Sequence, residues 1–420
     1  MCIFVLQANN KTVVLLKLKF IPASLFASLI IDAVSGNCLF MTGGDELNLV
    51  DKGNKIENSI SFFTSVSNYE SLKTIDGDKI FLKNLKVIIN GDTLISEEIN
   101  TRGGSTLLFR RKSYSFSLKS EVTFRHAERK ETFRKFYALS LSMDKNYSSN
   151  RLAFAMLEKI RLLGLFYSFC ELHINGNDEG ICMVVERPED WAMNKKNSPL
   201  IIRRGYNERI DKMQYSKIIE KSEAENYKDY FKLIYKSLNK YEGEELYKTL
   251  SQWIDLDNYM KWLSFNFIVR NGDYTDEVFL YIDPSINKFN IIPWDYDDLF
   301  LPAPHEGMHE SRKILGDKLI FSSEDKLDIK IASDPYLYKI YLTRLMETLD
   351  QLPSDTIKAI FENTYAELYP YYSASEIISM SKFDSHKDTN LSKLGNDMRS
   401  LFDQLKTVYA CYINHLKSLN

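Results

Sequence analysis

Residues 271–298 read NGDYTDEVFLYIDPSINKFNIIPWDYDD, the densest acidic segment of the chain. Two short apolar runs inside it, Val278–Tyr281 and Phe289–Ile292, are predicted strands, because they are rich in β-branched and aromatic residues and flank a polar turn. A helix is expected to end just before Asp273, which places Asp273 in a loop. Because a hairpin returns the chain to the level at which it started, we expect Asp295 to lie beside Asp273.

Acidic residues gather at the two ends of this predicted hairpin. They are Asp273, Asp276, Glu277, Asp295, Asp297 and Asp298. Carboxylates that are held close together repel one another unless a cation lies between them. Carboxylate oxygens are the ligands that Mg²⁺ and Mn²⁺ prefer. The segment therefore predicts a metal site with an adjacent general base.

The order of charged residues along the chain matches the order that phosphoryl transfer uses in protein kinases. One aspartate accepts the proton of the attacking hydroxyl, and a second aspartate, just downstream, holds the metal that bridges the phosphates. A basic residue on an earlier strand neutralises phosphate charge, and a carboxylate orients that residue. Here the basic residue is Lys112 or the adjacent Arg111, and the carboxylate is Glu158 on a predicted helix or Glu186 on the next strand. The pattern predicts a phosphotransferase.

The hydrophobic period differs between the two halves of the chain. Residues 78–120 alternate apolar and polar side chains, which is typical of half-buried strands. Residues 149–164 have helical spacing, and the pattern after residue 335 is helical to the end. A β-rich first part followed by an α-rich part with a small β insert predicts an α+β protein with two lobes.

Three regions are expected on this basis. Residues 1–75 are an unassigned N-terminal extension, 76–210 a β-rich lobe, and 211–420 a mainly helical lobe that carries the acidic site. The apolar run 20–31 is too short to span a bilayer, so no transmembrane span is expected. Residues 1–35 are compatible with a secretory signal peptide and equally with a buried strand or helix.

The sequence resembles the spore coat protein H (CotH) kinase family, which has an atypical protein-kinase-like fold. The similar blocks are TRGGST at 101–106, RKSY at 111–114, NRLA at 150–153, GICMVVE at 180–186, and Asp273 followed by VFLY and IPWDYD up to residue 297. The last block is the most specific, and the resemblance covers about residues 80–415.

The resemblance implies that ATP and Mg²⁺ or Mn²⁺ are cofactors and that the substrate is a serine or threonine hydroxyl of a protein, such as a coat or surface protein. It implies Asp273 as catalytic base and Asp295 as metal ligand, with Asp297 and Glu277 as further metal-site residues. The residues assigned to nucleotide binding are Arg102, Arg111, Lys112, Glu158 and Glu186. Of these, Glu186 matches a family position and Glu158 follows from the expected geometry alone.

Some positions depart from the family pattern. Glu277 stands where the family usually has asparagine, and Arg111 replaces the first lysine of a Lys-Lys pair. Arginine is a poor mimic of a compact ammonium. The kinase-type G-x-G-x-x-G loop is absent, and Gly103–Gly104 is the local substitute. A catalytically degenerate structural or assembly protein with the same fold is therefore the alternative function.

A second motif points to different chemistry. His305-Glu306-Gly307-Met308-His309 matches the H-E-x-x-H pattern of zinc metalloproteases. Pro302 and Pro304 precede it, and a glycine inside a helix costs about 1 kcal/mol relative to alanine. The context favours an exposed loop over a zinc-binding helix.

Charge and cysteine content argue against a nucleic-acid-binding protein and against a disulfide-rich or zinc-ribbon protein. The chain has 54 basic and 57 acidic residues, so there is no electrostatic reason to expect a nucleic-acid partner. Five scattered cysteines without a C-x-x-C pair are not a disulfide or zinc scaffold. Cys170 and Cys182 flank a predicted hairpin and are expected to be buried thiols rather than a bridge.

Overall fold

The computed structural model describes residues 46–301, 304, 315–316, 318–321, 324–387 and 389–418, all within one compact unit that begins at residue 44. The segment 1–35 considered as a signal peptide and the His305–His309 motif lie outside the described residues. None of the described helices combines the length and apolar character needed to cross a membrane.

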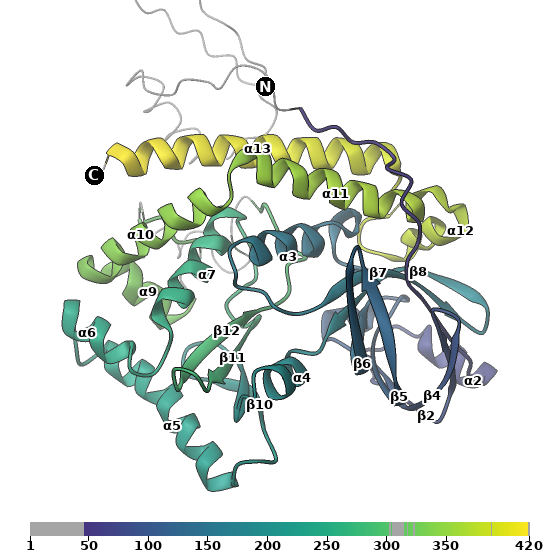
Figure 1. Cartoon of the computed structure of the whole chain (residues 1–420), viewed down its shortest axis with the longest axis horizontal. Helices are drawn as coiled ribbons and strands as arrows, with labels where there is room; N and C mark the ends of the chain where they lie inside the picture. Colours follow the sequence, from purple (N-terminus) through teal and green to yellow (C-terminus); the bar gives the residue numbers. More distant parts are fainter. Residues whose placement is uncertain are drawn as a thin grey trace, which may run out of the picture. The chain divides into compact units, whose positions relative to one another are not determined.

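A closed, barrel-like sheet occupies the first half of the described chain (Figure 1). Its strands are β1 (Ser59–Phe62), β2 (Phe81–Lys83), β3 (Lys86–Ile89), β4 (Asp92–Arg102), β5 (Ser113–His126), β6 (Arg129–Leu139), β7 (Tyr167–Ile174) and β8 (Asn177–Glu186). The strand order is β2-β4-β3-β1-β7-β8-β6-β5, and an additional β4–β5 pairing closes the sheet. Strand β1, from the range that the sequence left unassigned, pairs in parallel with β7.

Alternation along β5 places its large side chains inside the barrel. Tyr114, Phe116 and Leu118 are buried, as their spacing predicts. The rings of Phe116 and Phe136 stack with centroids 4.9 Å apart. Cys170 on β7 and Cys182 on β8 are register partners, and both are free and buried, as expected.

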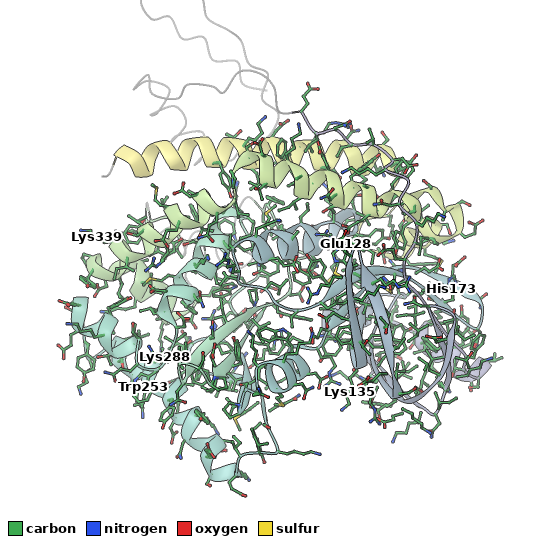
Figure 2. The ribbon with its side chains drawn as sticks, viewed as in Figure 1. Glu128, Lys135, His173, Trp253, Lys288 and Lys339 are labelled. Carbon is green, nitrogen blue, oxygen red and sulfur yellow. The ribbon has the colours of Figure 1, made fainter. Side chains whose placement is uncertain are left out.

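A second, smaller sheet follows, with strand order β10-β9-β11-β12. Its strands are β9 (Leu200–Arg204), β10 (Ile210–Tyr215), β11 (Val278–Asp283) and β12 (Lys288–Pro293), and all pairings are antiparallel. The predicted hairpin is therefore β11–β12. Its turn end lies against the segment before helix α7 (Leu256–Ile268), where the Phe289 N–H donates to the Trp253 carbonyl at 2.8 Å (Lys288 and Trp253 are labelled in Figure 2).

Helices make up most of the remainder, so the α+β class is confirmed. Helices α2 (Val66–Leu72), α3 (Ser149–Lys159) and α4 (Pro188–Asp190) accompany the barrel strands in sequence. The later helices are α5 (Lys221–Leu238), α6 (Gly243–Leu250), α7 (Leu256–Ile268), α9 (Lys326–Ser333), α10 (Pro335–Gln351), α11 (Ser354–Ser373), α12 (Ser375–Ile378) and α13 (Leu391–Ser418). Short turns of helix are η1 (Ser105–Leu108), η2 (Lys145–Tyr147), η3 (Trp191–Lys195) and η4 (Ser379–Phe383).

Two apolar cores hold these elements together. One fills the barrel, and the other joins α3, the second sheet and the later helices. Helices α11 and α13 pack side by side, and α11 also contacts α3 (Figure 1). Helix α3 thus lies in the core that surrounds the β11–β12 hairpin.

Candidate functional site

The open end of the β11–β12 hairpin brings Asp273 and Asp295 together. Val278, the first residue of β11, pairs with Pro293, the last residue of β12. The segments beyond the hairpin continue side by side, because the Gly272 N–H donates to the Asp298 carbonyl at 2.9 Å. Asp273 and Asp295 consequently line the same cavity, which is the juxtaposition expected from the sequence.

This cavity has a volume of about 560 Å³. Its carboxylates are Asp273, Glu277, Asp295, Asp297 and Asp298, and its cations are Lys79, Arg102, Arg203 and Lys212. The barrel contributes the loop Gly103–Thr106 and the apolar side chains Tyr137 and Leu139; Leu141, Met143, Phe154 and Trp294 extend the apolar lining. The cavity is therefore built from the barrel, from α3, from β9 and β10, and from the two chain segments at the open end of the hairpin.

Asp295 sits in a constrained backbone. Its φ is +55°, a left-handed conformation that aspartate tolerates better than most residues. On one side, the Trp294 ring packs edge-on against Tyr137, with centroids 6.0 Å apart. On the other side, Tyr296 is fully buried and its N–H donates to Asn150 Oδ1 at 2.9 Å. These contacts hold Trp294 and Tyr296 in place, so the backbone between them is fixed and Asp295 lines the cavity.

Helix α3 supplies that anchor through Asn150. Asp144 precedes the helix and accepts hydrogen bonds from the Ser149 and Asn150 N–H groups, both at 2.8 Å. Asp144 also accepts from Asn150 Nδ2 at 3.1 Å, which leaves Oδ1 free to accept from Tyr296. Sequence reasoning placed Asn150 in a family block but gave it no role. Its contact with Tyr296 joins residues that are 146 positions apart, so no local pattern could indicate it.

The carboxylates of the cavity destabilise one another in their ionised form. Burial, followed by the charge of Asp295, raises the pKa of both Asp297 and Glu277 well above the usual range. Burial also raises the pKa of Asp295, while the charges of Arg102 and Arg203 oppose that rise. The Arg203 guanidinium forms an ion pair with Glu277. Ionising all of these carboxylates together is therefore unfavourable, and the nearby arginines reduce that cost only in part.

The donor set suits a hard divalent cation. Within the described residues, no three His, Cys, Asp or Glu side chains converge as a complete metal-binding group. Mg²⁺ is usually held by one or two carboxylates together with water and substrate phosphates, rather than by an all-protein cage. Asp295 and Asp297, which are half-buried and raise each other's cost of ionisation, fit that incomplete type of site.

Two basic residues assigned to nucleotide binding do not line the cavity. Arg111 is buried, donates through Nε to the Glu179 carbonyl at 2.7 Å and forms an ion pair with Asp384. Lys112 Nζ donates to the Thr74 carbonyl at 2.6 Å and is also buried. Both cations satisfy backbone or buried groups elsewhere, and burial lowers the pKa of Lys112.

The two assigned glutamates also lie away from the cavity lining. Glu158 accepts from the Tyr167 hydroxyl at 2.8 Å, and Glu186 forms an ion pair with Lys195 at 2.9 Å. By contrast, Arg102 is in the lining, with its guanidinium 4.0 Å from the Tyr137 ring centroid. The structure thus brings together Asp273, Glu277, Asp295, Asp297 and Arg102 from the expected set.

Three cations that line the cavity were not predicted from the sequence: Lys79, Arg203 and Lys212. Each lies on or next to a short strand rich in charged residues, where a solvent-facing side chain is the ordinary expectation. The Arg203-Arg204 pair, at the end of β9, was the one local feature of the sequence that could have indicated a cation at this site. Arg203 Nε donates to the Asp276 carbonyl at 3.0 Å, beside the acidic loop.

Comparison with known proteins identifies the family of this chain. The family described as CotH kinase protein matches residues 99–397. Inner spore coat protein H of Bacillus subtilis (strain 168) is 22% identical over 332 residues, which are 73% of this chain and 87% of that protein. The resemblance drawn from the sequence blocks is thereby confirmed.

Proposed function

The chain belongs to the CotH kinase protein family, and from this premise we propose that it transfers the γ-phosphoryl group of ATP to a serine or threonine hydroxyl of a protein. Family membership suggests a kinase-like protein. The observation that carries the proposal is the meeting of Asp273 and Asp295 at the open end of one hairpin, in a cavity lined by a glycine-containing loop.

We propose a two-lobed, atypical kinase-like arrangement, with residues 76–210 and 211–420 as the lobes. The lining of the cavity supports this division, because the loop 103–106 comes from the barrel and the acidic residues come from the second region. An anionic ligand between two such regions would be enclosed on both sides. Enclosure excludes water and strengthens the electrostatic interactions inside the site.

In the proposed reaction, the hydroxyl oxygen attacks the γ-phosphorus while the bond to the β-phosphate oxygen breaks and ADP leaves. Asp273 accepts the hydroxyl proton. Asp295 and Asp297 would hold Mg²⁺ or Mn²⁺, which when bound neutralises developing charge on the phosphates. Glu277 is an additional oxygen donor at the rim of that site, and its ion pair with Arg203 balances its charge.

The test is phosphate transfer from radiolabelled ATP with Mn²⁺, to the protein itself and to dephosphorylated casein. Asp273→Asn should lower the rate roughly 100-fold or more, because general-base contributions are about 10²–10⁴-fold. Asp295→Asn should abolish metal-dependent ATP binding in a thermal-shift assay. Asp229→Asn, at an exposed position of α5, is the matched control and should keep full activity. A wild-type protein with neither transfer nor metal-dependent ATP binding would refute the proposal.

A second candidate is a non-catalytic assembly protein with the same fold. Two observations favour it: Glu277 adds a charge where the family usually has a neutral amide, and the named relative is a coat protein. ATP binding without transfer in the same assays would support this candidate. Restoring transfer with Glu277→Asn would identify the added charge as the cause.

A further inference from the structure

Two consecutive arginines at the end of β9 hold residues 273–277 from two sides, and we call this segment the acidic loop. Neighbouring side chains of a strand point to opposite faces. Arg203 lines the cavity, where its Nε donates to the Asp276 carbonyl at 3.0 Å. Arg204 is 1% exposed, and its Nε donates to the Thr275 carbonyl at 2.8 Å. Two successive carbonyls of the acidic loop are thus held by side chains of one strand.

Aromatic packing connects Arg204 to the residue that follows Asp273. The Tyr274 ring is buried and packs edge-on against Trp262 of α7, with ring centroids 5.4 Å apart. The Arg204 guanidinium lies 5.4 Å from the Trp262 ring centroid and 5.6 Å from that of Tyr259. Arg204, Trp262 and Tyr259 therefore form a buried layer against which the acidic loop packs.

A buried network compensates the charge of Arg204. Its Nη1 donates to the Tyr259 hydroxyl, which in turn donates to Asp328 Oδ1. Asp325 Oδ1 lies 3.9 Å from the same Nη1, and Asp325 Oδ2 accepts from the Tyr235 hydroxyl at 3.0 Å. Asp325 and Asp328 are both fully buried. Because moving the guanidinium away would leave these buried carboxylates without their cation, the network keeps Arg204 in one place.

Arg204 supports the site without reaching the reacting groups. Among the described residues that line the cavity, Asp273 is present and Arg204 is not. We propose that Arg204 is a positioning residue, which holds the acidic loop so that the Asp273 carboxylate stays within hydrogen-bonding reach of the acceptor hydroxyl. This inference rests on the proposed function and adds to it a residue outside the cavity on which the base depends. A base misplaced by about 1 Å can cost about 100-fold in rate.

The geometry of the guanidinium group suits this role, because its donors point in fixed directions. Nε donates to the Thr275 carbonyl while Nη1 donates to the Tyr259 hydroxyl. Lysine has the same charge but carries it on one compact ammonium at the end of a flexible stem. Arg204→Lys therefore keeps a cation near Asp325 and removes the two-pronged contact with the acidic loop.

The experiment measures kcat and the KM for ATP in the casein assay with Mn²⁺. Arg204→Lys should lower kcat about tenfold and leave the KM for ATP within about twofold, because the lost contact holds the base and not the nucleotide. The matched control is Arg344→Lys, which changes an arginine of α10 whose Nε donates to Asp257 of α7 at 3.1 Å. Arg344 lies outside the cavity lining, so this variant should keep wild-type kinetics.

A double variant separates positioning from a general structural role. If Arg204 acts through the Asp273 carboxylate, Arg204→Lys should lower the residual rate of Asp273→Asn by less than about twofold, because the positioned group is already gone. A residue that only stabilises the fold would lower the rate by the same factor in both backgrounds. Deuterium exchange of the peptide 271–277 should be faster in Arg204→Lys and unchanged in Arg344→Lys.

Tyr259→Phe repeats the test if circular dichroism shows that Arg204→Lys does not fold. It removes the hydroxyl between Arg204 and Asp328 but keeps the ring, and it should lower kcat about threefold without changing the KM for ATP. An unchanged kcat, a raised KM alone, or equal losses with and without the Asp273 carboxylate would overturn the inference. If wild-type protein transfers no phosphate, the transfer proposal fails; faster exchange in the variants then supports the hold on the loop, and unaltered exchange refutes it.

Discussion

The ion pair between Arg151 on α3 and Glu367 on α11 provides a quantitative test of the structure. Arg151 Nε and Nη2 donate to the two carboxylate oxygens of Glu367 at 2.7 and 2.6 Å. Their side chains are 7% and 23% exposed. This pair ties α11 to the helix that carries Asn150, and Asn150 anchors the loop around Asp295. We predict that Glu367→Gln destabilises the fold.

The magnitude follows from the pKa of Glu367. Burial raises this pKa, but the Arg151 charge and the hydrogen bonds from Arg151 and His126 lower it to about 2, compared with an ordinary value of 4.5. Each pKa unit corresponds to about 1.4 kcal/mol, so the ionised pair contributes about 3 kcal/mol. Breaking a buried pair by removing one partner costs about 3–5 kcal/mol, which agrees.

The pH dependence has a definite sign. Because the folded-state pKa is depressed, the contribution is fully present above pH 4.5 and is lost as the pH falls toward 2. Between pH 7 and pH 3.5, the wild-type contribution from this group should fall by about 1.4 kcal/mol. Glu367→Gln does not titrate there, so the difference between the two proteins should shrink from about 3 to about 2 kcal/mol.

Urea unfolding of the full chain, followed by tryptophan fluorescence at both pH values, measures these differences. The control is Glu244→Gln, which breaks the Lys248–Glu244 pair, whose side chains are 70% and 60% exposed. Exposed pairs contribute about 0–1 kcal/mol, so little change is expected. If Glu367→Gln costs no more than the control at pH 7, or if its cost is independent of pH, the reasoning is refuted.

Two further predictions concern the glycine-containing loop of the cavity and the Asn150 anchor, and Gly104→Ala is the control for the first. Gly103 has φ +108°, and a Cβ there would lie 1.8 Å from Thr106 Oγ1, so Gly103→Ala should distort the loop and weaken ATP binding at least tenfold. Gly104→Ala meets no atom within 4 Å and should bind ATP normally; equal effects of the two would contradict the loop geometry. Asn150→Ala leaves the Tyr296 N–H without its acceptor, at a cost of about 1–3 kcal/mol. Faster hydrogen exchange at the Tyr296 amide is the expected readout, and unchanged protection would count against that anchor.

Local pattern was sufficient to predict the hairpin and its acidic ends. Val278–Tyr281 and Phe289–Ile292 are short apolar runs around a polar turn, and a two-stranded hairpin has only one way to place its flanking residues. The alternation that buries Tyr114, Phe116 and Leu118 likewise follows from the two-residue period of a strand. These features depend on residues close together in sequence.

Features that depend on contacts between distant parts of the chain could not be predicted from the local sequence pattern. Strand β1 is only four residues long and is defined by its partners, β3 and β7, the second of which lies more than 100 residues away. Arg111 and Lys112 donate to buried carbonyls that only the folded barrel brings to them, and these contacts could not be predicted from the sequence. A long cation satisfies the acceptors nearest to it, and sequence does not reveal which acceptors those are.

The hydrophobic period was enough to predict the α+β class, short motifs indicated the family, and the hairpin pattern predicted that Asp273 and Asp295 meet. Which cations share the cavity with that pair depends on long-range contacts that no local pattern indicates. Lys212 lies opposite Arg203 in the register of β9 and β10, and Lys79, just before β2, lines the same cavity. Register is set by the packing of whole sheets against their cores, and a shift of one residue would turn the Lys212 side chain to the opposite face.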